Sequence, residues 1–316
     1  MSTYTSPPLP PGHRAELPGR GTTFYREVAG PPGAPVLLLL HGWTASADLN
    51  FHGLFDELGE TYRVIAPDHR GHGRGIRADE RVTLEDCADD ASALCLHLGI
   101  ERVTAVGYSM GGTIAQILWH RHPDLVDAMV LCATASRFTD GWKDSAVFGL
   151  LGGLSRAGRK LPESFQTKIG MRLINSRRRE LDEWVTAELE RHDWAQVGEA
   201  GLALGRYDSN SWISAIDVPT SVIVTLHDDV VDPIRQLRMG RAIPGADLQL
   251  VEGNHAVCSA EPERFARVLL TAVGKVGVRA RAREAIVPRA RVAAAGQAAP
   301  SASEGFSVWR PSPQPA

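Results

Sequence analysis

Short, continuous runs of apolar residues recur along the chain, separated by stretches with helical periodicity. Residues 36–40 contain only valine and leucine, which is typical of a strand buried on both faces of a parallel sheet. In residues 22–28 apolar and polar side chains alternate more, which indicates an antiparallel strand leading into the sheet. Further strands are predicted at residues 62–66, 103–107, 128–133, 221–226 and 248–251. The alternation of strands and helices predicts an α/β fold, with a mostly parallel sheet and helices on both faces.

The helices between these strands have readable starts and ends. Thr83, with Asp86 three residues later, resembles a capping box. A one-faced apolar stripe follows and closes at Gly99; its members are Leu84, Cys87, Ala88, Ala91, Leu94, Cys95 and Leu98. A second helix is predicted over residues 111–120, directly after the strand at 103–107.

Residues 135–216 interrupt the alternation, because they contain helical patterns but no convincing strand. We interpret them as a helical cap inserted between the two parts of an α/β core at 21–134 and 217–277. Four tryptophans fall in this cap, as pocket lining or as the cap's own core: Trp142, Trp184, Trp194 and Trp212. The Pro-rich segment 1–20 and the Ala/Arg/Pro/Ser-rich tail 278–316 are expected to be disordered.

Composition excludes several classes of partner. The formal net charge of −3 leaves no basic footprint for nucleic acid. The amino-terminal residues lack the apolar segment of a secretory signal, and no apolar run is long enough for stable membrane insertion. We therefore expect a cytoplasmic protein with a small-molecule partner, and the oligomeric state stays open. The arginine-rich tail allows a weak contact with an anionic membrane, but a solvated extension is favoured.

The cysteines and histidines do not form the clusters typical of a metal site. Four cysteines in a chain of 316 residues are too few for a disulfide framework: Cys87, Cys95, Cys132 and Cys258. The first three lie in apolar patterns and are interpreted as buried thiols. We predict neither a metal nor a cofactor.

A Gly-x-Ser-x-Gly string formed by Gly107, Ser109 and Gly111 is the first sign of chemistry. It lies between the predicted strand at 103–107 and the predicted helix at 111–120. A serine in such a sharp turn has a strained backbone, and glycines two residues away let strand and helix approach. An ordinary Gly-rich turn is the alternative, but the strand–turn–helix setting favours Ser109 as a nucleophile.

Three segments together resemble the signatures of the α/β-hydrolase superfamily: residues 107–112, 41–43 and 68–73. The resemblance covers about residues 20–275 and implies the capped α/β-hydrolase fold. It also implies that the backbone N–H groups of Met110 and Trp43 form an oxyanion hole. The histidines of the two other segments, His41, His69 and His72, are interpreted as loop braces rather than as catalytic or metal-binding groups.

The acid and the base follow from the same resemblance, in which the chain order is serine, acid, histidine. Three carboxylates follow the strand at 221–226. Asp228 fits the family pattern best, Asp229 is the alternative one residue away, and Asp232 before Pro233 is interpreted as a helix cap. His255, in the loop after the last strand, is the predicted general base, and its alternative is a surface histidine.

These residues predict a serine hydrolase that cleaves a small or medium carboxylic ester through an acyl-enzyme intermediate. The imidazole activates the serine hydroxyl, and the carboxylate fixes the imidazole's tautomer. Acyl transfer, cofactor-free perhydrolysis and carbon–carbon hydrolysis remain alternatives, since they use the same three residues. A non-catalytic binding protein is disfavoured, because binding does not require an intact set of Ser109, Asp228 and His255.

Overall fold

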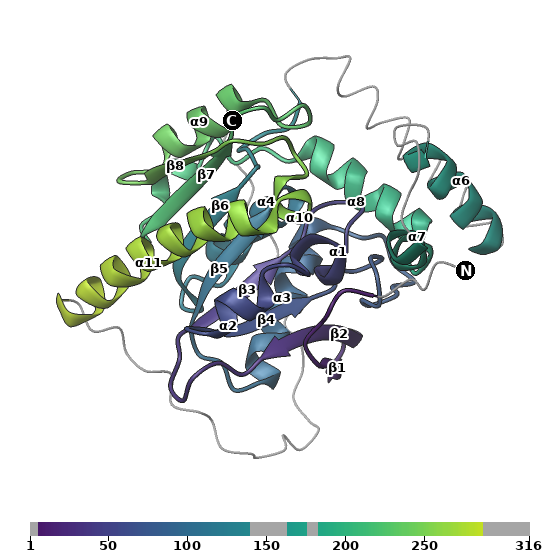
Figure 1. Ribbon diagram of the computed structural model, residues 1–316, viewed down its shortest axis with the longest axis horizontal. Coiled ribbons are helices and arrows are strands. Elements are labelled where there is room, and N and C mark those ends of the chain that lie inside the picture. Colours follow the sequence, from purple (N-terminus) through teal and green to yellow (C-terminus); the bar gives the residue numbers. More distant parts are fainter. Residues whose placement is uncertain (1–5, 140–162, 176–182, 287–316) are drawn as a thin grey trace, which may run out of the picture.

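The computed structural model describes residues 6–139, 163–175 and 183–286 of the chain. Within these ranges the strands form one eight-stranded sheet in the order β1-β2-β4-β3-β5-β6-β7-β8 (Figure 1). The strands are β1 (Gly12–Leu17), β2 (Gly21–Val28), β3 (Val36–Leu40), β4 (Arg63–Pro67), β5 (Val103–Tyr108), β6 (Val126–Cys132), β7 (Thr220–Thr225) and β8 (Asp247–Val251). β2 pairs antiparallel with β1 and β4, and all other neighbours are parallel. The predicted mostly parallel sheet is confirmed.

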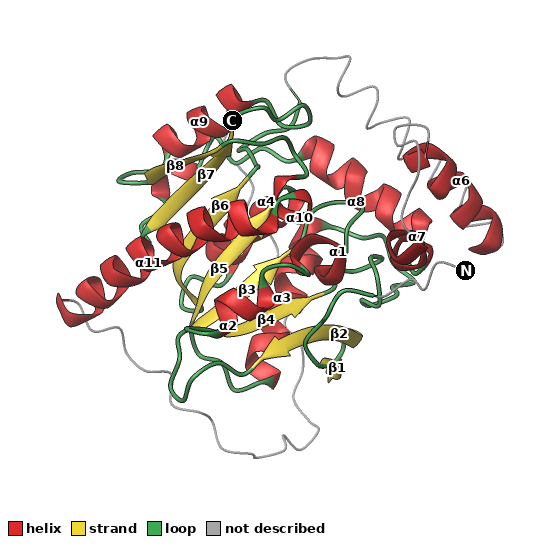
Figure 2. Ribbon diagram, in the orientation of Figure 1, coloured by secondary structure: helices red, strands yellow, loops and turns green. Residues whose placement is uncertain are grey.

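Helices cover both faces of this sheet (Figure 2). The helices on one face are α3 (Leu84–His97), α4 (Met110–Arg121) and α9 (Pro233–Ala242), and those on the other are α1 (Ala47–Phe51), α2 (Phe55–Gly59), α10 (Val257–Ala260) and α11 (Pro262–Ile286). Within β3, Leu38 and Leu40 belong to the first core and Leu37 and Leu39 to the second. Because successive side chains of a strand point to opposite faces, a strand covered on both sides is apolar throughout.

Two predicted helix starts agree with the structure. The Thr83 hydroxyl oxygen accepts the Asp86 N–H at 3.0 Å and so begins α3. The Asp232 carboxylate accepts the Ile234 N–H at 2.8 Å, and Pro233 is the first residue of α9. The short helices α1 and α2 were not predicted, because five residues are too few to show a helical period.

The described residues between β6 and β7 contain α6 (Glu163–Asn175), α7 (Glu183–Glu190), α8 (Trp194–Arg206) and the 3₁₀ helix η1 (Ile213–Ala215). A Cβ on Gly170 of α6 would lie 2.1 Å from the Trp194 ring, so this tryptophan of α8 packs against α6. Trp212 stacks on His120, with ring centroids 4.5 Å apart. Both are therefore packing residues. Trp142 lies outside the described residues.

The expected disorder at the two chain ends is wrong in part. Residues Gly12–Leu17 of the segment 1–20 form β1, because Ala15 and Leu17 are buried against the core when β1 pairs with β2. At the other end, α11 continues to Ile286 instead of ending near residue 277. Ala280 packs on the core and Arg283 pairs with Asp217 there. Residues 287–316 lie outside the described ranges, and none of the described helices has the length and hydropathy that crossing a bilayer requires.

Candidate active site

Ser109 lies in the sharp turn between β5 and α4. Its φ of 54° and ψ of −118° are rarely adopted by a residue with a side chain. A Cβ on Gly107 would lie 2.3 Å from the carbonyl oxygen of Gly111, and a Cβ on Gly111 would lie 1.9 Å from that of Leu40. The Gly-x-Ser-x-Gly string is therefore needed to bring strand, turn and helix together in this geometry.

The structure brings Ser109, His255 and Asp228 together from three separate loops. The Nε2 atom of His255 lies 3.0 Å from the Oγ atom of Ser109. The Nδ1 atom of His255 lies 2.8 Å and 3.0 Å from the two carboxylate oxygens of Asp228. These loops follow β5, β7 and β8, which run parallel, so their carboxyl ends meet at the same edge of the sheet.

Asp228 and Asp229 have different surroundings. Asp228 is 8% exposed, and its carboxylate also accepts the backbone N–H groups of Val230 and Val231 at 2.9 Å and 2.8 Å. Burial opposes its charge, but hydrogen bonds from His255, Thr225 and Val231 outweigh it and hold the pKa of Asp228 below its ordinary value. Asp229 is exposed. Of the two carboxylates, the structure brings Asp228 to the histidine.

Two further side chains hold this arrangement and were not predicted from the sequence. Gln236 of α9 is fully buried and donates to Asp228 Oδ2 at 3.2 Å and to Thr225 Oγ1 at 2.8 Å. The Tyr108 hydroxyl donates to the backbone oxygen of His255 at 2.9 Å. A glutamine on the buried face of a helix is a detectable signal, because a buried amide requires hydrogen-bond partners.

The loop after β3 lies beside the serine. A Cβ on Gly42 would be 3.4 Å from the Cβ of Ser109, and the next residue is Trp43, whose backbone N–H was predicted as an oxyanion donor. The other predicted donor, the Met110 N–H, is the first of α4. The first N–H groups of a helix have no partner within the helix, which favours an anion at this end.

His41, His69 and His72 form a buried group next to this loop. The Nε2 atom of His41 accepts the backbone N–H of His69 at 2.9 Å. The ring centroids of the two histidines are 4.2 Å apart. Burial lowers the pKa of all three rings, that of His69 to about 3, so the rings are neutral. Their interpretation as loop braces agrees with these contacts.

The cysteines are buried and unpaired, as the sequence predicted for three of them. Burial raises the pKa of Cys95 to about 12, so it stays a thiol at neutral pH. Among the residues that the structure describes, no group of three or more His, Cys, Asp or Glu side chains is arranged to hold a metal ion.

Comparison with known proteins gives a consistent family match. The profile of the alpha/beta hydrolase fold family matches residues 35–262. An uncharacterized protein of Mycobacterium tuberculosis is 30% identical over 253 residues, which are 73% of each chain. A bifunctional esterase/perhydrolase of Acinetobacter calcoaceticus is 36% identical over 101 residues, 32% of this chain and 36% of the relative.

Solved structures agree with this match. A thermophilic esterase from Thermogutta terrifontis superposes with a TM-score of 0.68 at 25% identity. The superposition covers 84% of this chain and 99% of the esterase. The sheet order, the turn at Ser109 and the sequence profile therefore all indicate the same family.

Proposed function

The chain belongs to the α/β-hydrolase family, and we propose that it is a serine hydrolase that cleaves carboxylic esters through an acyl-enzyme intermediate. In this proposal Ser109 is the nucleophile, His255 is the general base, and Asp228 orients the imidazole. The observation that carries the proposal is the continuous hydrogen-bond path from Ser109 Oγ through both nitrogens of His255 to Asp228.

The geometry supports each proton transfer of such a reaction. The carboxylate of Asp228 only accepts hydrogen bonds, so Nδ1 of His255 carries a proton and Nε2 has a free lone pair. At 3.0 Å, Nε2 takes the hydroxyl proton while Ser109 Oγ attacks the ester carbon. The tetrahedral intermediate then releases the alcohol, which takes the proton from Nε2. Water attacks the acyl-enzyme by the same route, releases the acid and restores Ser109.

The negative charge of the intermediate requires donors next to the serine. We assign this role to the backbone N–H groups of Met110 and Trp43. Met110 follows the nucleophile at the amino end of α4, where the helix dipole also favours negative charge. Trp43 follows Gly42, at which an added Cβ would lie 3.4 Å from the Cβ of Ser109. One such donor contributes about 10²–10³-fold to kcat in comparable enzymes.

Turnover of p-nitrophenyl esters of increasing acyl length tests the proposal and reports the size of the acyl pocket. The protein should hydrolyse small or medium esters without added metal or cofactor. Ser109→Ala should lower kcat by about 10⁴-fold or more, with little change in thermal stability. The matched control is Ser214→Ala, at an exposed serine of η1. Ester turnover that survives in Ser109→Ala would reject the assignment.

Perhydrolysis is a second candidate, favoured by the similarity to the bifunctional esterase/perhydrolase. In that reaction hydrogen peroxide replaces water, attacks the acyl-enzyme and releases a peracid. Peracid formation from acetate and hydrogen peroxide, measured through oxidation of bromide, would support it if it depends on Ser109. A protein with neither activity that still binds esters would be a non-catalytic member of the family.

A further inference from the structure

His192 joins the cap to two loops of the core. It lies in the turn between α7 and α8 and is 5% exposed. Its Nδ1 atom accepts the backbone N–H of Gly73 at 2.7 Å, and its Nε2 atom contacts the carbonyl oxygen of Thr44 at 3.2 Å. Thr44 directly follows Trp43, whose backbone N–H is the proposed oxyanion donor. A single cap side chain thus contacts the loop beside the nucleophile.

These two partners determine the protonation of the ring. An N–H group can only donate, so Nδ1 of His192 has a free lone pair. A carbonyl oxygen can only accept, so Nε2 carries the proton. Burial lowers the pKa of His192 to about 4, and the ring therefore stays neutral at physiological pH. In this tautomer the ring is a fixed bridge between Gly73 and Thr44.

The loop that receives this bridge has an unusual backbone. Residues 42–45 form a tight turn in which the Ala45 N–H donates to the Gly42 oxygen at 3.3 Å. Thr44 has a φ of 59° there, a left-handed conformation that a β-branched residue rarely adopts. Such a conformation persists only where surrounding contacts hold it. The Trp43 side chain supplies another contact, since its Nε1–H donates to the Val197 oxygen of α8 at 2.7 Å.

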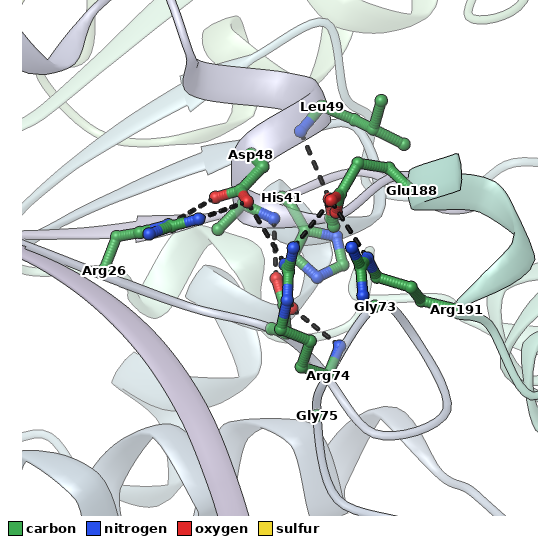
Figure 3. A network of polar contacts seen from close by, with 12 residues as sticks. Arg26, His41, Asp48, Leu49, Gly73, Arg74, Gly75, Glu188 and Arg191 are labelled. Carbon is green, nitrogen blue, oxygen red and sulfur yellow. Dashed lines mark hydrogen bonds and ion pairs between the residues drawn. The ribbon is translucent and has the colours of Figure 1, made fainter. Parts of the chain in front are cut away.

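The turn that carries His192 is itself firmly attached to the core. Its backbone N–H at Asp193 donates to the Gly71 oxygen at 2.8 Å. On α7, the Glu188 carboxylate accepts from Arg74 at 2.6 Å and from Arg191 at 3.0 Å. Figure 3 shows the Arg74 guanidinium between Glu188 of the cap and Asp48 of the core. These charge-assisted contacts set the position from which His192 reaches Thr44.

We propose that His192 is a positioning residue that holds the turn at residues 42–45 so that the Trp43 N–H faces the reacting carbonyl oxygen. This inference rests on the proposed function and extends it, since it makes the cap part of the apparatus that stabilises the transition state. A shift of about 1 Å in such a donor can lower turnover by about 10²-fold. Loss of the bridge should therefore reduce kcat and leave KM nearly unchanged.

Two substitutions separate this role from simple packing. The amide of an asparagine ends near the position of Nδ1, whereas the amide of a glutamine reaches the position of Nε2. His192→Gln keeps a donor for Thr44, and its kcat should stay within about 3-fold of the wild-type value. His192→Asn lacks that donor, and its kcat should fall about 10–100-fold with KM unchanged. The control is Glu199→Ala, which removes a buried carboxylate of α8 that accepts the backbone N–H of Val82 at 3.0 Å, a contact between the cap and a different loop of the core.

The outcomes are distinct. The inference would be overturned if kcat were the same in His192→Asn and the wild type. It would also be overturned if kcat fell equally in both histidine variants and in Glu199→Ala. Ester turnover by the wild type that requires Ser109 tests the proposed function independently of His192. If the variants do not fold, ¹⁵N NMR of the wild-type histidines decides: His192 must be neutral with the proton on Nε2 between pH 5 and 8, and a proton on Nδ1 overturns the proposal.

Discussion

Replacing Asp228 with asparagine tests the contacts around His255 most finely, because the change removes a charge and hardly alters the shape. One carboxylate oxygen accepts the backbone N–H groups of Val230 and Val231, so the amide oxygen must take that side. The amide NH₂ then takes the place of Oδ2, facing the Thr225 hydroxyl, the Gln236 amide and Nδ1 of His255. An NH₂ group opposite Nδ1 favours the tautomer with its proton on Nε2.

That tautomer has no lone pair directed at Ser109, so the serine proton cannot be taken. The same substitution in a well-studied serine protease lowers kcat by about 10⁴-fold for this reason. We expect a loss of about 10³–10⁴-fold here, equal to about 4–5.5 kcal/mol in the activation free energy. Stability should also fall, by about 1.5–3 kcal/mol, because charge-assisted hydrogen bonds to the carboxylate are weakened.

The assay is kcat on one p-nitrophenyl ester, with a thermal melt of each variant to confirm folding. Asp229→Asn is the matched control, since its side chain is exposed and one residue away. It should keep kcat within about 2-fold and stability within about 0.5 kcal/mol. A crippled Asp229→Asn beside a nearly normal Asp228→Asn would refute the reasoning and assign the acid to Asp229.

The packing also sets the response of stability to pH and to two glycine substitutions. Below pH 6.5 the unfolded chain protonates histidines that stay neutral when folded, since burial lowers the pKa of His41, His69, His72 and His192. The free energy of unfolding should therefore fall as the pH decreases from 6.5 to about 4, the pKa of His192, because only the unfolded chain takes up these protons. Asp68 has the opposite effect, because burial raises its pKa to about 6 and its carboxylate therefore takes up a proton in the folded state. A free energy of unfolding, measured in urea, that does not change with pH would contradict the prediction. Gly274→Ala, with nothing within 4 Å of its new Cβ inside α11, should raise the free energy of unfolding by about 0.5–1 kcal/mol, whereas Gly111→Ala should prevent stable folding. A lower melting temperature for Gly274→Ala, or a normal one for Gly111→Ala, would contradict the packing described.

The sheet could be predicted well because it is buried on both faces. Its parallel strands are continuous apolar runs, and the observed bounds of β3 match the predicted residues 36–40. β1 could not be recognised, since Ala15 and Leu17 are its only buried residues and its other four residues are exposed. Two buried residues are too few to show the alternation of a strand. The last turns of α11 were missed for a related reason. Beside the packing of Ala280, their contacts include arginine side chains, such as Arg279 to the Gly245 oxygen, and composition does not distinguish these arginines from a solvated tail.

Some site residues could be predicted from the sequence and others could not, because some depend on neighbouring residues and others on contacts between segments far apart in the chain. The turn at Ser109 has local glycine requirements, so its pattern is visible in five residues. The choice between Asp228 and Asp229 depends on which side chain points toward a histidine 27 residues away. Gln236 and His192 act through contacts with β7, the 42–45 turn and Gly73, and contacts between such distant segments are visible only once the chain is folded.

The central claim, that Ser109 is a nucleophile activated by His255, is tested most directly by covalent labelling. The protein should be incubated with a fluorophosphonate, digested and analysed by mass spectrometry. We predict one adduct, on the peptide that contains Ser109, absent in Ser109→Ala and formed far more slowly in His255→Ala. No adduct on the folded protein, or an adduct on another residue that persists in Ser109→Ala, would contradict the claim.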